Sequence, residues 1–262
     1  MGIVNITPDS FSDGGKFLDP ARALQHARQL LADGADLLDV GGESSRPGAE
    51  AVSVDEELRR VMPVLEQLVG LPVPISVDTS KPEVMRRAIA AGAALINDIF
   101  ALQAPGALEA VAASEAGVCL MHMQGEPRTM QRAPEYRDVV QEVCDFLAAR
   151  AGAAQAAGIG HDRIVIDPGF GFGKTPHHNL ELIRALPRFR ALGLPVLVGL
   201  SRKSLFGKIV GREAQGRDNA SAAGALLAAQ RGASILRVHD VAATRDSLLV
   251  LRAIDDPDYS LS

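Results

Sequence analysis

The sequence has no tryptophan, only two cysteines and no apolar run of roughly 18 residues, the length that a membrane-spanning helix needs. Cys119 falls in a predicted buried strand and Cys144 in a predicted helix, as is typical of small core residues in a reducing compartment. Basic residues are not in excess, and the net charge of −5 argues against nucleic acid as the main partner. No signal peptide is recognisable, because Asp9 and Asp13 follow the start almost at once, so we expect a cytoplasmic protein.

What the sequence does have is a recurrence of short apolar runs, most of them ending in a polar residue, at intervals of roughly 33 residues. The runs occupy residues 3–5, 37–40, 75–78, 95–98, 118–121, 164–167, 196–199 and 235–239. Helix-like segments fill the gaps at residues 20–34, 53–68, 80–92, 105–114, 135–157, 178–187, 217–232 and 241–254. Eight such units predict one α/β domain over residues 1–262, a (β/α)8 TIM barrel with its active site at the C-terminal face of the strands. Because the first strand begins almost at residue 1, either side chains alone close the barrel floor or a short N-terminal segment is missing.

Polar residues gather at or just beyond the predicted strand ends. They are Asn5, Asp78, Asn97, Asp167, Lys203, Arg237 and His239. One such residue would usually be a turn asparagine or a helix cap, but seven on one rim favour an active site. Glycine-rich loops at 13–15, 41–42 and 169–174 suggest a lid that orders when substrate binds.

The loop at 169–174 is not a nucleotide-binding loop. A Walker A motif needs glycine where Pro168 stands ahead of Gly173-Lys174-Thr175. The dinucleotide motif needs a third glycine where Lys174 stands. Both nucleotide interpretations are therefore excluded.

The chemistry of the rim suits a transfer reaction. Carboxylates such as Asp78 and Asp167 accept hydrogen bonds from the N–H groups of a flat heterocycle, on which the plane of Arg237 can stack. Asn5, Arg237 and His239 suit an anionic leaving group, with a hard cation, and the segment 201–204 suits a second anion. No Ser-His-Asp or Cys-His arrangement falls at the strand ends, so covalent catalysis is not indicated.

Several blocks of the sequence resemble the dihydropteroate synthase family of folate biosynthesis, which sulfonamides inhibit. Residues 1–15, MGIVNITPDSFSDGG, resemble its first signature, and 42–48, GESSRPG, resemble its second. Further blocks match in order at residues 76–79, 96–98, 121–124, 167–174, 201–204 and 237–239. The resemblance covers the whole chain.

This resemblance implies a transferase that joins 6-hydroxymethyl-7,8-dihydropterin diphosphate to p-aminobenzoate, releasing diphosphate, with Mg2+ near Asn5. It implies that the pterin is bound by Asp78, Asn97, Met121, Asp167, Lys203 and Arg237. It implies that the diphosphate is bound by Asn5, Arg237 and His239. It implies that p-aminobenzoate is bound by Phe11, Ser45, Arg46, Pro47, Phe172, Ser201, Lys203 and Ser204. The catalytic residues would be Asp78, Asp167, Lys203, Arg237 and His239.

Chemistry and resemblance agree on a route in which diphosphate leaves first and the amine then attacks a pterin cation. An aromatic amine is neutral and nucleophilic near pH 7, so the step that needs help is departure of a highly charged group. The chain departs from the family at Ser45, where threonine is common; the hydroxyl is kept, but packing around the aminobenzoate ring could change.

Two rival functions share part of this pattern. A barrel that passes a folate methyl group to a corrinoid protein would share Asp78, Asn97 and Asp167, but it has no need of the first signature. A pterin-binding paralogue without synthase activity would be expected to lose loop residues, whereas Phe11 and Arg46 are present. The resemblance also suggests a homodimer, for which the alanine-rich stretch 220–229 would provide a smooth helix. His122 is either a packed residue or a catalytic one.

Overall fold

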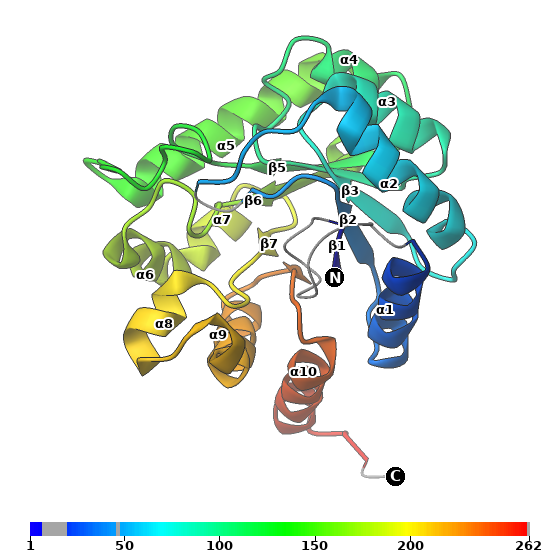
Figure 1. Cartoon of the computed structure of the whole chain (residues 1–262). Helices are drawn as coiled ribbons and strands as arrows, with labels where there is room; N and C mark the ends of the chain where they lie inside the picture. The colour runs from blue at the N-terminus through cyan, green and yellow to red at the C-terminus, as the bar shows by residue number, and fades with distance from the viewer. Residues whose placement is uncertain (7–19, 46–47, 261–262) are drawn as a thin grey trace.

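Eight parallel strands form the centre of the computed structural model, which describes residues 1–6, 20–45 and 48–260 (Figure 1). They are β1 (Gly2–Asn5), β2 (Leu38–Gly41), β3 (Ile75–Asp78), β4 (Leu95–Asp98), β5 (Gly117–Met121), β6 (Ile164–Asp167), β7 (Leu197–Val198) and β8 (Ile235–Leu236). Strands β1 to β6 pair in sequence order, and β7 pairs with β8. Parallel bridges between Ile166 and Val196 and between Gly2 and Val238 join these two sheets at both edges. The ring of strands is thereby closed, which confirms the predicted TIM barrel.

Helices surround the strands and cover their outer faces (Figure 1). They are α1 (Pro20–Ala32), α2 (Val54–Leu68), α3 (Pro82–Ala90), α4 (Ala107–Ala112), α5 (Val139–Ala156), α6 (Pro176–Arg184), α7 (Leu186–Arg190), α8 (Ser204–Val210), α9 (Asp218–Gln230) and α10 (Val241–Asp255), with short 3₁₀ turns η2 (His161–Arg163) and η3 (Ala214–Gly216). Among the described residues, no helix is long and apolar enough to span a membrane.

Three helical elements differ from the sequence-based expectation. The predicted helix 178–187 is two helices, because Pro187 lies at the first turn of the second one. Helix α8 lies outside the helical segments that the sequence predicts. Helix α5 begins at Val139 rather than at 135, because Asp138 caps it and the side chain of Gln124 pairs with both backbone groups of Glu135.

The interior of the barrel has an apolar layer toward the N-terminal ends of the strands. Its side chains are Met1, Leu37, Leu95, Cys119, Val165, Leu197 and Ile235. Alternate residues of a strand face opposite sides, so Leu38 and Val40 pack toward the helices while Asp39 faces the interior. At the next interior positions of four strands lie the polar residues Asp39, Asn97, Asp167 and Arg237, which concentrates charge toward the carboxyl ends of the strands, here called the mouth of the barrel.

Candidate active site

Strand register places three predicted rim residues level with one another at the mouth. Asn5 pairs with Gly41, Gly41 with Asp78, and Asp78 with Asn97. A Cβ atom on Gly41 would lie 3.5 Å from Asp78 Cβ and 3.9 Å from Asn5 Oδ1. Glycine at this position therefore leaves space between the two polar side chains.

Arg237 follows β8 and bridges two carboxylates at the mouth. Its Nε donates to Asp39 Oδ2 at 2.6 Å, and one terminal nitrogen donates to Asp78 Oδ2 at 2.9 Å. Asn97 Nδ2 also donates to Asp39 Oδ2, at 3.4 Å. Burial raises the pKa of Asp78, and the Asp39 charge adds to this rise although Arg237 opposes it. Two carboxylates from neighbouring strands thus fix the plane of one guanidinium, and the Asn97 amide binds one of these carboxylates.

Asp39 is a site residue that a search of strand ends misses. It lies within β2, two residues before the end of the strand, and is fully buried. Its Oδ1 has no hydrogen-bond partner among the described residues. A carboxylate inside an apolar run is the sequence signal for such a residue. Charged side chains are buried almost only where an opposite charge or a hydrogen-bond donor pairs with them.

A second carboxylate–cation arrangement lies at the ends of β5 to β7. Asp167 ends β6 beside Met121, its register partner, and its Oδ1 accepts the N–H of Gly169 at 2.7 Å. Burial raises the pKa of Asp167, against the opposing effect of that N–H and of Lys203. Lys203 precedes α8, and its Nζ lies 4.2 Å from the ring centroid of Phe172. Burial lowers the pKa of Lys203 to about 8, a fall that the Asp167 charge opposes.

The glycine-rich loop after β6 packs against the backbone of the loop after β5. A Cβ atom on Gly169 would lie 1.8 Å from His122 O, and one on Gly173 would lie 2.3 Å from Gln124 O. Their φ angles are +70° and +60°, values that residues other than glycine rarely adopt. The glycines therefore permit a close contact between two loops that carry predicted site residues.

Lys174 holds the same two loops together from a buried position. Its Nζ donates to His122 Nδ1 at 2.9 Å, to Phe172 O at 2.9 Å and to His122 O at 3.3 Å. Burial lowers the pKa of Lys174 to about 7 and that of His122 to about 3. The His122 ring also packs edge-on against Phe146, at a centroid distance of 4.9 Å. The structure thus places His122 in a packed position.

Replacing Gly169 with alanine is expected to lower the melting temperature more than the same change at Gly158. Gly158 has a φ of +98°, and a Cβ atom added there would meet no neighbouring atom. Gly158→Ala therefore measures only the free-energy cost of the left-handed backbone, about 1 kcal/mol. Gly169→Ala adds the clash with His122 O and should cost at least about 2 kcal/mol more. Thermal unfolding of the two variants checks this, and equal losses would contradict the close contact.

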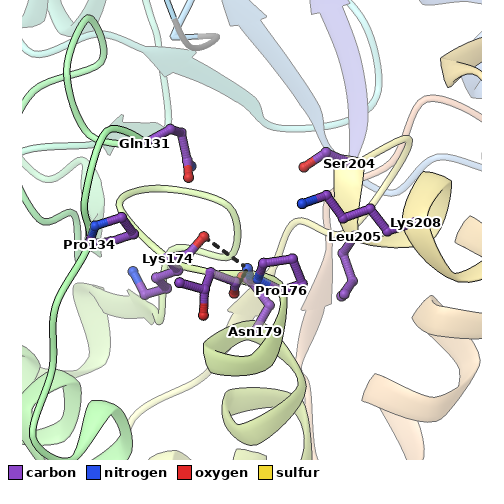
Figure 2. A pocket seen from close by; sticks show the side chains of 9 residues that line it. Gln131, Pro134, Lys174, Pro176, Asn179, Ser204, Leu205 and Lys208 are labelled. Carbon is purple, nitrogen blue, oxygen red and sulfur yellow. Dashed lines mark hydrogen bonds between the residues drawn. The ribbon is translucent and has the colours of Figure 1, made fainter.

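Two cavities adjoin the mouth. One of about 240 Å³ lies between the loop after β5 and the start of α8, where Gln131 and Ser204 face each other across it (Figure 2). Lys174 and Lys208 also line it. The other cavity, of about 230 Å³, is lined by both Ser45 and Asp78. Three residues predicted for the aminobenzoate site, Phe11, Arg46 and Pro47, lie outside the described residues.

The segment after β7 is fixed by α9 and by the end of β8. Ser201 Oγ accepts the backbone N–H of His239 at 3.2 Å and lies 2.9 Å from His239 Nδ1. Arg202 has a φ of +57°, its N–H donates to Ser221 Oγ at 2.9 Å, and its guanidinium pairs with Asp218 at 2.7 Å. These contacts bring Ser201 and Lys203 to the mouth from one short segment.

The mouth combines hydrogen-bond acceptors with cations. Its carboxylates suit the N–H donors of a polar heterocycle, and Lys203 and Arg237 suit an anion beside it. No group of three or more His, Cys, Asp or Glu side chains that could hold a metal ion occurs in the parts of the chain that the structure covers. Any metal here would therefore need ligands from elsewhere, such as an amide oxygen or a bound phosphate.

Comparison with known proteins identifies the family. Residues 1–239 match the pterin binding enzyme family. A dihydropteroate synthase of Neisseria meningitidis serogroup C is 53% identical, over 97% of this chain and 92% of that protein. The structure of Xanthomonas albilineans dihydropteroate synthase with 4-aminobenzoic acid has a TM-score of 0.93 at 57% identity, covering 98% of this chain and 92% of that one. That enzyme in complex with 7,8-dihydropteroate has a TM-score of 0.89 at 55% identity, covering 98% and 93%. The chain therefore belongs to the pterin-binding enzymes and, within them, to the dihydropteroate synthase family.

Proposed function

We propose that this protein is a dihydropteroate synthase, which condenses 6-hydroxymethyl-7,8-dihydropterin diphosphate with p-aminobenzoate to give 7,8-dihydropteroate and diphosphate. The observation that carries the proposal is the mouth itself, where Arg237 pairs with Asp78, Asn97 donates to the neighbouring Asp39, and Asp167 ends β6. The chain is also about half identical to named synthases. Residues 1–262 act as one domain in this proposal, because strands from β1 to β8 contribute to the same mouth.

The pterin is proposed to bind between the two carboxylate arrangements. Asp78 and Asp167 accept hydrogen bonds from its ring and amino N–H groups, and Asn97 and Lys203 reach its remaining polar edge. Met121 packs on the ring from the end of β5. Arg237 stacks on the ring, and its ion pairs with Asp39 and Asp78 would fix the plane of that stacking.

The diphosphate is proposed to lie toward β1 and β8, within reach of Asn5, Arg237 and His239. Mg2+ prefers oxygen ligands and commonly takes only one or two from the protein, the rest coming from phosphate and water. The amide oxygen of Asn5 at the mouth fits that pattern. When bound, the ion supplies positive charge to the phosphate oxygens.

The p-aminobenzoate is proposed to bind along the start of α8. Phe172 and Lys203 flank its ring, and Ser201 and Ser204 bind its carboxylate by hydrogen bonding. Ser45, Phe11, Arg46 and Pro47 would complete the site from the first two loops. The cavity beside Ser204 in Figure 2 provides space next to this position.

The residues act mainly on the departing group. Arg237 and His239 stabilise negative charge that develops on the diphosphate, and Asp78 and Asp167 stabilise the pterin cation left behind. The amine of p-aminobenzoate is neutral and attacks without a general base. Departure therefore precedes attack, and the released proton passes to solvent.

Product identification tests the proposed reaction. Purified protein is incubated with both substrates and Mg2+, and products are separated and weighed by mass spectrometry. We expect 7,8-dihydropteroate only when p-aminobenzoate is present. Bound pterin with no dihydropteroate would contradict synthase activity and favour a paralogue that only binds pterin.

A homodimer is part of the proposal. Helices α9 and α10 pack against each other, and they expose Leu227, Leu249, Val250 and Ile254, the last with 75% of its surface accessible. Exposed apolar side chains on two neighbouring helices are typical of a protein interface. Light scattering at micromolar concentration should give twice the chain mass, and Ile254→Asp should give the monomer mass. A monomeric wild-type protein would contradict the dimer.

We also propose a cytoplasmic location. Cys119 and Cys144 are both free and buried, as is usual in a reducing compartment.

A further inference from the structure

The loop between β4 and α4 contains two consecutive residues with a strained backbone. Ala101 and Leu102 have φ angles of +52° and +57°, in the left-handed region. Residues other than glycine disfavour this region, and they normally enter it singly. Both side chains are almost completely buried, at 0% and 1% exposure, so this is not a loose surface turn. Such strain persists only where the surroundings impose it.

Asp98 imposes the conformation from the end of β4. This carboxylate is fully buried; its Oδ1 accepts the N–H of Phe100 at 2.9 Å, and its Oδ2 accepts that of Leu102 at 2.7 Å. Burial raises the pKa of Asp98 to about 6, although the two amides and Arg150 favour the ionised form and oppose this rise. An ionised carboxylate accepts both hydrogen bonds at once.

Arg150 holds the same residues from α5. Its Nε donates to Ala101 O at 2.8 Å, and a terminal nitrogen donates to Leu102 O at 3.1 Å. Its charge also favours the ionised form of Asp98. The backbone of the two strained residues is therefore bound on its N–H side by Asp98 and on its carbonyl side by Arg150.

The loop fixed in this way borders the candidate active site. Asn97 directly precedes Asp98, and its carbonyl accepts the N–H of Thr79, next to Asp78. Ile99 and Phe100 line the cavity that Asp78 also lines. Because Ala101 and Leu102 turn into the core, the two residues before them remain directed at the cavity.

We propose that Asp98 and Arg150 are positioning residues that hold Asn97, Ile99 and Phe100 in the geometry that binds the pterin. This inference rests on the proposed function and deepens it, since neither residue touches substrate. The residues act through the backbone of the loop, so their loss should weaken pterin binding and leave p-aminobenzoate binding nearly unchanged.

Arg163 provides a matched control for Arg150. It is half-buried like Arg150, and its guanidinium likewise binds backbone carbonyls, those of Ala116 and Val111. Ala116 lies at the N-terminal end of β5, at the opposite end of the barrel from the mouth. Arg163→Met should therefore lower stability as Arg150→Met does, with no effect on substrate binding.

Steady-state kinetics of the full chain tests the proposal. Arg150→Met should raise the KM for the dihydropterin diphosphate and the Kd for 6-hydroxymethylpterin by roughly tenfold, with the KM for p-aminobenzoate within about twofold of wild type. Asp98→Asn, which keeps one acceptor oxygen, should shift the same constants in the same direction. Equal pterin constants in Arg150→Met and Arg163→Met would overturn the proposal.

Amide hydrogen exchange separates this inference from the function on which it rests. The amides of Phe100 and Leu102 should exchange at least about tenfold faster in Arg150→Met than in Arg163→Met, whatever reaction the protein catalyses. Unchanged exchange would overturn the role of Arg150. If the wild-type protein did not bind pterin, the proposed function would be wrong. The exchange rates of the two variants would still show whether Arg150 holds the loop.

Discussion

Arg237→Met is expected to lower kcat roughly a hundred- to a thousandfold and to lower the free energy of unfolding by about 3–5 kcal/mol. Turnover falls because the guanidinium no longer stabilises the departing diphosphate. Stability falls because Asp39 is fully buried and the Asp78 side chain is only 15% exposed, and both would lose their counter-charge. Steady-state kinetics and chemical denaturation measure the two effects on the same preparation.

A double variant separates the two effects. Adding Asp39→Asn to Arg237→Met removes one of the uncompensated buried charges, so part of the lost stability should return. Turnover should not return, because the positive charge at the mouth is still absent. If the double variant regained turnover, Arg237 would act only through the fold. If Arg237→Met were as stable as wild type, the ion pairs with Asp39 and Asp78 would not matter to folding.

Asp167→Asn is expected to lower kcat by roughly a hundredfold while weakening binding of the ground-state pterin much less. Asparagine keeps an oxygen for the N–H of Gly169, which Asp167 accepts at 2.7 Å, so the loop should stay in place. What is lost is the negative charge beside the pterin cation. Titration with 6-hydroxymethylpterin gives the ground-state affinity, and single-turnover kinetics give the chemical step.

Asp162 supplies the matched control for Asp167. It is exposed and lies in η2, directly before β6, so it stands at the opposite end of the strand that Asp167 ends. Asp162→Asn should leave both turnover and pterin affinity unchanged. Equal losses of turnover and ground-state affinity in Asp167→Asn would contradict its role in stabilising the cation.

The barrel could be predicted because its strands leave a strong local signal. Each strand is a short apolar run, most of them with a polar end, and the connecting helices have apolar residues at helical spacing. The same regularity located the ends of β1, β3, β4 and β6, where Asn5, Asp78, Asn97 and Asp167 lie. The register then brought the first three of these to one level.

Other parts of the site depend on contacts between residues far apart in sequence. The carboxylate of Asp39 stands out within an apolar run, but its partner Arg237 lies 198 residues later and is identified only by the fold. Helix α8 is short, and Ser204–Val210 lacks a side-chain cap, so nothing local marks its start. The strained backbone at Ala101 and Leu102 is bound on its carbonyl side by Arg150 from another helix, which no pattern in the sequence reveals.

The glycines of the loop at residues 169–174 have a structural reason that the motif alone does not give. The spacing at 169–174 excludes a nucleotide-binding loop, but it does not say why glycines recur there. The structure supplies the reason: Gly169 and Gly173 each approach a carbonyl of the preceding loop so closely that no Cβ fits. Lys174 holds the two loops together by hydrogen bonds to His122 in one loop and to Phe172 in the other.

Diphosphate release is the measurement that tests the central claim most directly. Wild-type protein is given the dihydropterin diphosphate and Mg2+, with and without p-aminobenzoate, and diphosphate and dihydropteroate are followed together. We predict equal amounts of both products when p-aminobenzoate is present, and a slower release of diphosphate alone when it is absent. Saturable pterin binding with no diphosphate released under either condition would contradict the assignment of the mouth of this barrel as a dihydropteroate synthase site.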